Sequence, residues 1–115
     1  MSAIIPPSSI PWTWLVIAGI FEVVWAVLTR YTDGFTRPLP TLATLVAMGL
    51  SVYFLSLAVR SLPIGTAYAV WTGIGIVGTV IAGMVLFDEP RGLVRFLCIL
   101  LILAGIAGLN LTVQQ

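Results

Sequence analysis

Charged side chains are scarce in this sequence. Only 8% of the 115 residues are charged, whereas 60% are hydrophobic. In a soluble domain about a quarter of the residues are charged. The composition therefore excludes an ordinary soluble domain and indicates a protein that lies within a membrane. The formal net charge of +1 identifies no partner by itself.

The sequence also lacks the residues that most often carry metal and redox chemistry. It contains no histidine, which is the commonest metal ligand and the usual proton carrier near neutral pH. The single cysteine, Cys98, excludes a disulfide within the chain. No nucleophile–base pair and no cluster of metal ligands is visible. We therefore expect no enzyme, no bound metal or cofactor, and no nucleic-acid partner.

Four long apolar segments are present instead. Each falls within the range of about 17–25 residues that crosses the hydrocarbon core as a helix. A membrane barrel would show short segments of alternating polarity, and none is visible. The sequence predicts an all-α membrane protein, a bundle of four transmembrane helices that forms a single transmembrane domain over residues 1–115. The expected helices span residues 12–29, 39–59, 64–87 and 94–113.

The connections between these segments are short. Asp33-Gly34 is a turn signal after the first segment, and residues 88–92 form a charged hairpin before the last one. Helices joined so tightly should run up and down, with both termini on one side of the membrane. The chain shows no internal repeat, so any two-fold symmetry should arise between chains.

Arginines concentrate on the side of the membrane opposite the termini. Since cytoplasmic loops carry an excess of basic residues, this bias favours termini outside the cell. The terminal side carries Arg60 and the N-terminal amine. The opposite side carries Arg30, Arg37, Arg91 and Arg95.

Glu22 is the only charged residue within the first apolar segment, Trp12–Thr29. A carboxylate in hydrocarbon is costly unless it faces a partner, a cavity or a pathway, so Glu22 is a candidate functional residue. The alternative is a protonated side chain that only bonds another helix. Trp25 follows Glu22 by three residues and Gly19 precedes it by three, and this spacing places them on one helix face.

Polar and aromatic side chains in the middle helices could complete a site with Glu22. Tyr68 and Trp71 share a face of the third segment, where their rings suit cation–π contact, although core packing is an alternative. Ser51 lies in the second segment, where hydroxyls also bond helix carbonyls. Gly73 and Gly75 permit either a hinge or close helix packing.

The fourth segment carries small residues at helical spacing. Such residues let another helix approach closely, although similar pairs also occur by chance. We therefore expect a helix-association face that contacts a second chain. Its members are Ala104, Gly105 and Gly108.

In combination, these features resemble the small multidrug resistance family of four-helix transporters. The similarity covers nearly all of the chain from Trp14 to Leu111. The motifs that carry it are Gly-Ile-Phe-Glu-Val-Val-Trp at 19–25, Asp-Gly-Phe-Thr at 33–36, Pro63 to Gly75 with Tyr-Ala-Val-Trp at 68–71, and Glu89-Pro90. Trp25, with Ser51 and Thr72-Gly73, resembles the guanidinium-exporter subtype.

The resemblance implies a proton-coupled antiporter of the inner (plasma) membrane that exports guanidinium and small substituted guanidines. Proton and substrate would compete for Glu22, which Trp25 and Ser51 would position by hydrogen bonds. Tyr68 and Trp71 would wall the pocket. The family works as an antiparallel dimer, either of one chain or of two related chains. Two alternatives stay open, which are a broad exporter of quaternary ammonium cations and a non-transporting membrane adaptor.

Overall fold

The computed structural model describes residues 10–113, so residues 1–9 and 114–115 of the predicted domain lie outside the description. The described residues form four α-helices and no strand. The helices are α1 (Ile10–Tyr31), α2 (Pro38–Ala58), α3 (Ile64–Leu86) and α4 (Leu93–Val113). All four are long and apolar enough to cross a membrane. The prediction of an all-α chain with four membrane-spanning helices is therefore confirmed.

The α1–α2 connection is a tight turn built on left-handed backbone. Asp33, Gly34 and Phe35 have φ angles of 50°, 70° and 65°. The Thr32 hydroxyl donates to the Thr29 carbonyl at 2.7 Å and accepts the Phe35 N–H at 3.1 Å. α2 then starts at Pro38. Proline has no backbone N–H, and the N–H groups in the first turn of a helix have no partner within the helix, so proline is tolerated there.

The α3–α4 connection folds back over the end of α3. The backbone N–H groups of Phe87 and Glu89 both donate to the Gly83 carbonyl, at 3.0 and 3.1 Å. The Arg91 guanidinium donates to the Met84 carbonyl at 2.5 Å. These bonds satisfy carbonyls that the last turn of a helix leaves without partners.

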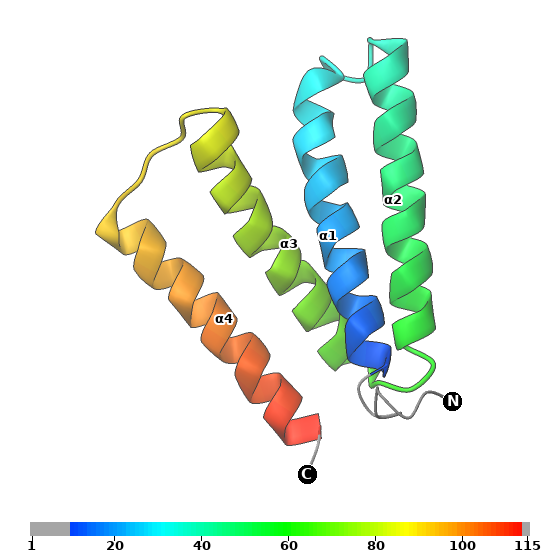
Figure 1. The fold of residues 1–115 in the computed structure, drawn as a ribbon, viewed down its shortest axis with the longest axis vertical. Coiled ribbons are helices and arrows are strands. Elements are labelled where there is room, and N and C mark those ends of the chain that lie inside the picture. The colour runs from blue at the N-terminus through cyan, green and yellow to red at the C-terminus, as the bar shows by residue number, and fades with distance from the viewer. Residues whose placement is uncertain (1–9, 114–115) are drawn as a thin grey trace.

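The helices form an open array in which α1 packs between α2 and α3 (Figure 1). Among the described helices, α4 contacts α3 alone. The α1–α2 and α3–α4 connections lie at one end of the array, and the start of α1 and the end of α4 lie at the other (Figure 1). The structure therefore has the up-and-down order that the short connections predict.

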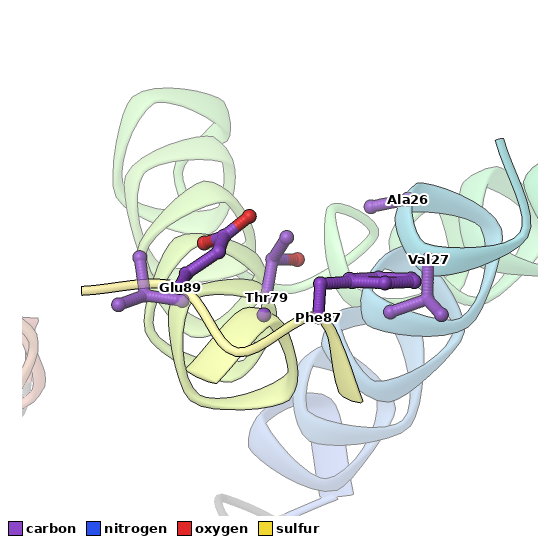
Figure 2. A pocket seen from close by; sticks show the side chains of 7 residues that line it. Ala26, Val27, Thr79, Phe87 and Glu89 are labelled. Atoms are coloured by element: carbon purple, nitrogen blue, oxygen red, sulfur yellow. The ribbon is translucent and has the colours of Figure 1, made fainter. Parts of the chain in front are cut away.

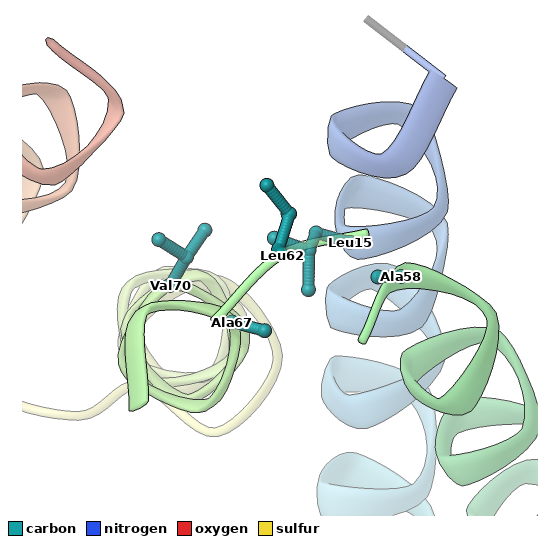
Figure 3. Close-up of a cluster of buried hydrophobic side chains, with 5 residues drawn as sticks. All are labelled: Leu15, Ala58, Leu62, Ala67 and Val70. Atoms are coloured by element: carbon teal, nitrogen blue, oxygen red, sulfur yellow. The ribbon is translucent and has the colours of Figure 1, made fainter. Parts of the chain in front are cut away.

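The buried core lies near the end of the array that holds the start of α1. There α1, α3 and the α2–α3 connection meet (Figure 3). Most large apolar side chains elsewhere are exposed. Because lipid tails are as apolar as these side chains, that exposure suits a membrane-spanning chain. The core cluster consists of Leu15, Ala58, Leu62, Ala67 and Val70.

Candidate functional site

Glu22 lies near the middle of the membrane-spanning length of α1. It stands nine residues before Tyr31, the last residue of the 22-residue helix. At about 1.5 Å per residue, the nearer helix end is about 13 Å away. In a membrane-spanning α1, the backbone of Glu22 therefore lies deep within the hydrocarbon layer.

Small residues bring the backbones of α1 and α3 together around Glu22. A Cβ atom added at Gly75 of α3 would overlap the Glu22 carboxyl group. Added at Gly78 or Gly19, it would overlap Val23 or Ile74 of the facing helix. Glycine at these positions thus allows a close helix contact, and at Gly75 it leaves the space that the Glu22 side chain fills.

One oxygen of Glu22 is buried without a hydrogen-bond partner in the described part of the chain. That atom is Oε1. An unpaired polar atom in an apolar environment costs free energy, and a charged group at mid-membrane costs about 2.5–3.5 kcal/mol on insertion scales. A group with this cost and no internal partner is suited to hold a proton or a cation that enters from outside.

Glu22 and Trp25 border an open cavity of about 240 Å³ between α1 and α3. Gly75, Ile76, Thr79 and Val80 of α3 line the opposite wall, and Ala26 lines the α1 side. The carboxylate and the indole therefore meet the same space, as their spacing of three residues along α1 predicts.

Ser51 joins three helices one turn away from Glu22. The fully buried Ser51 hydroxyl donates to the Ala18 carbonyl of α1 at 2.7 Å and accepts the Trp71 Nε1–H of α3 at 2.9 Å. The Trp71 ring lies 5.4 Å from the ring of Tyr68. The structure thus brings three of the predicted pocket residues into one network.

This network and the cavity beside Glu22 are neighbours but distinct. Trp71 precedes Gly75 by four residues, which is about 6 Å along α3. In the single chain the hydrogen bonds of Ser51 run to Ala18 and Trp71. A bond from Ser51 or Trp25 to the carboxylate stays a prediction for an assembled transporter.

The predicted hinge glycines belong to an unbroken helix and face different neighbours. An added Cβ at Gly73 would lie 2.8 Å from Ile106 of α4, whereas Gly75 faces Glu22 of α1. Both positions therefore serve close packing in this conformation. A hinge at Gly73 and Gly75 stays a prediction.

The predicted association face of α4 is exposed in the single chain. Ala104, Gly105 and Gly108 are all exposed, and added Cβ atoms at both glycines would meet nothing within 4 Å. α4 instead packs on α3 through Ile106 and Ile102, which face Gly73. The small-residue face is therefore not used within the described chain.

Sequence reasoning missed the residues that line the cavity along α3. Ile76, Thr79 and Val80 carry no unusual chemistry, and only their spacing after Gly75 could have indicated the shared face. The Ala18 carbonyl was also missed as an acceptor, because a backbone group leaves no signal in the sequence.

A carboxylate with one buried, unpaired oxygen beside an open cavity, in a chain whose described residues form four helices able to span a membrane, is typical of a small membrane transport protein. The family described as Small Multidrug Resistance protein matches residues 10–102. The chain belongs to the small multidrug resistance family. It is a multi-pass protein of the inner membrane and a transporter rather than an enzyme.

Curated relatives support this assignment over almost their whole length. The chain is 58% identical over 100 residues to a protein of Yersinia pseudotuberculosis named guanidinium exporter, covering 87% of this chain and 96% of the relative. It is 54% identical over 101 residues to a guanidinium exporter of Citrobacter freundii, covering 88% and 96%. A guanidinium exporter of Salmonella typhimurium strain LT2 is 52% identical over the same shares.

Proposed function

We propose that the chain is a proton-coupled antiporter that exports guanidinium and small substituted guanidines. The observation that carries the proposal is the Glu22 carboxylate, which lies deep in the membrane with Oε1 buried and unpaired beside an open cavity. The relatives are named guanidinium exporters, and these names support the same substrate class.

The chemistry of the substrate suits this carboxylate. Guanidinium is flat and presents N–H groups in a fork that a carboxylate accepts with both oxygens. Protonation of Glu22 removes the negative charge and turns one acceptor into a donor, so proton and cation exclude each other. The Trp25 ring borders the same cavity, and an aromatic ring there suits cation–π contact with the bound cation. Ser51, Tyr68 and Trp71 wall the adjoining side.

The proposed working unit is an antiparallel homodimer. One chain supplies a single Glu22, so a second copy is needed to bring two carboxylates to the bilayer centre. The unpartnered α4 face with Gly105 and Gly108 supplies the contact between copies. A related chain of opposite orientation is the alternative partner.

Two copies of one fold in different conformations provide alternating access without an internal repeat. The deprotonated pair binds the cation on one side, the loaded dimer exchanges its opening, and protonation from the other side releases the cation. The empty charged form exchanges poorly, since it exposes unpaired carboxylates to hydrocarbon. Gly73 and Gly75 are the proposed points at which α3 bends.

Uptake into proteoliposomes tests the proposal. With guanidinium as the only substrate cation tested, a proton gradient should drive its accumulation, and Glu22→Gln should abolish this flux while the protein still folds. Asp33→Asn is the matched control, because it removes one exposed carboxylate from a connection. Proton-driven guanidinium flux that survives in Glu22→Gln would show that the shared site is wrong. Full biological activity of Glu22→Gln would instead favour the alternative of a non-transporting membrane adaptor.

Substrate size separates guanidinium export from broad cation export. Trp25 occupies volume beside Glu22, so compact guanidines should be good substrates and large polyaromatic cations poor ones. Currents for guanidinium and for a large aromatic cation, measured on the same proteoliposomes, compare the two functions. Equal currents would favour the broad quaternary ammonium exporter.

A further inference from the structure

The cavity beside Glu22 continues toward the α3–α4 connection. A second cavity of about 160 Å³ is lined by Phe87 and Glu89. Ala26, Thr79 and Val80 line both cavities, so the two spaces adjoin. Together they form one groove between α1 and α3, called here the α1–α3 groove, with Glu22 at its deep end and Glu89 at its outer end.

Local backbone holds the Glu89 carboxylate at this outer end. The Glu89 N–H donates to the Gly83 carbonyl at 3.1 Å, and a Cβ atom at Gly83 would overlap the carboxylate. Figure 2 shows the Glu89 carboxylate and Thr79 on the α3 side of the pocket, with the Phe87 ring reaching across to Val27 of α1. The connection thus presents an acid and an aromatic ring to one space.

Two guanidinium groups of the chain already occupy this acid and this ring. Arg95 Nη2 lies 3.6 Å from Glu89 Oε1, and Arg30 Cζ lies 4.4 Å from the centre of the Phe87 ring. The Glu89 and Arg95 side chains are 40% and 37% exposed. A half-exposed ion pair at this distance is weak, so a free guanidinium ion can replace Arg95 on the carboxylate.

We propose that Glu89 and Phe87 form an outer subsite for guanidinium-type cations, from which the cation passes along the α1–α3 groove to Glu22. Gly83 and Gly75, which contact the two carboxylates, are eight residues apart, or about 12 Å along α3. One small cation cannot bridge that distance, so the two acids bind it in succession. Arg95 holds the outer carboxylate when no cation is present. The inference rests on the proposed export of guanidinium.

The test compares two single-charge variants in neighbouring positions. Glu89→Gln should raise the guanidinium concentration for half-maximal transport about twofold to fivefold at low ionic strength, and the maximal rate should stay unchanged. The difference should shrink at high salt, because the carboxylate is partly exposed. Asp88→Asn is the matched control, because Asp88 is exposed and its φ of 53° suits asparagine. It should match the unaltered protein.

Arg95→Gln should change the guanidinium concentration for half-maximal transport in the opposite direction. Since Arg95 competes for Glu89, its removal should lower the half-maximal concentration. If Glu89→Gln matches Asp88→Asn, or if both Glu89→Gln and Arg95→Gln raise that concentration, the outer subsite is wrong and the pair only holds the connection. Should Glu89→Gln fail to fold, Arg95→Gln decides alone. Absence of guanidinium flux in the unaltered protein would overturn the proposed function itself.

Discussion

At the scale of single residues, the surroundings of Glu22 depend on a missing side chain. Gly75 has no Cβ, and its place is taken by the Glu22 carboxyl group. The carboxylate can therefore press against the α3 backbone while Trp25 borders the cavity beside it. One oxygen of this carboxylate is buried without a partner among the described residues, which suits it to the proposed binding of a proton or a cation from outside.

The proposed competition of proton and cation for Glu22 predicts a pH-dependent affinity for guanidinium. Because a proton must leave before the cation binds, affinity for guanidinium should weaken as pH falls. The limit is about tenfold per pH unit for each proton displaced. Quenching of tryptophan fluorescence in detergent, with Trp25 beside the site, measures this affinity across pH. An affinity that stays constant while transport changes with pH would argue against competition at one carboxylate.

A methyl group at position 75 should disturb the same carboxylate. Gly75→Ala places a Cβ where Glu22 now lies, so we expect a loss of about 1–3 kcal/mol of stability from overpacking. Transport should fall by about tenfold or more, since the carboxylate moves. Thermal unfolding in detergent and uptake measure the two effects. Gly49→Ala is the control, because an added Cβ there meets nothing within 4 Å. Equal behaviour of the two variants would contradict this account.

At the scale of helices, a single hydroxyl ties α1, α2 and α3 together. Ser51→Ala removes the acceptor of the Trp71 N–H, so a partly buried donor loses its partner at a cost of about 1–3 kcal/mol. Thermal stability should fall accordingly. Ser56→Ala is the matched control, because that exposed hydroxyl only bonds the Tyr53 carbonyl of its own helix. Similar losses in both variants would show that the link between the helices contributes little.

The exposed face of α4 predicts how copies associate. Because α4 contacts α3 alone among the described helices, its small-residue face is open to another chain. Gly108→Leu should reduce the dimer fraction in detergent, since a large side chain keeps the backbones apart. Gly49→Leu, which changes an exposed glycine of α2, should leave the fraction unchanged. Analytical ultracentrifugation compares the two, and an unaltered dimer in Gly108→Leu would place the contact elsewhere.

At the scale of the whole molecule, the arginines are distributed unequally between the two ends. The α1–α2 and α3–α4 connections lie at one end of the array, and the α2–α3 connection, which carries Arg60, lies at the other (Figure 1). The basic connections predict an orientation with those connections in the cytoplasm. An antiparallel homodimer requires copies in both orientations, so the bias bears directly on the identity of the partner. The arginines at the connection end are Arg30, Arg37, Arg91 and Arg95.

Reconstitution of the purified single chain decides between the two partners. We expect proton-driven guanidinium transport from this chain alone, as a homodimer provides two copies of Glu22. The matched measurement uses the chain co-expressed with a related subunit. If only the co-expressed pair transports guanidinium, the partner is the related chain.

The sequence by itself determined the class of the molecule. Long apolar segments separated by short polar connections predict four membrane-spanning helices, because every backbone group in hydrocarbon must be bonded within its own segment. Glu22 stood out for a related reason, since a lone carboxylate in such a segment is costly. The motifs around Glu22 and Tyr68 also indicated the family to which the chain belongs.

The tertiary structure decided which residues meet. From the sequence, Gly75 could serve either a hinge or close helix packing. Only the approach of α3 to α1 shows that the absence of a side chain at Gly75 makes room for Glu22. The sequence left open whether the Ser51 hydroxyl bonds a helix carbonyl or the Glu22 carboxylate, and the packing of α1 against α2 brings it to the Ala18 carbonyl. Helical spacing defines the faces of each helix, but the rotation and distance between helices depend on side-chain packing across the whole array.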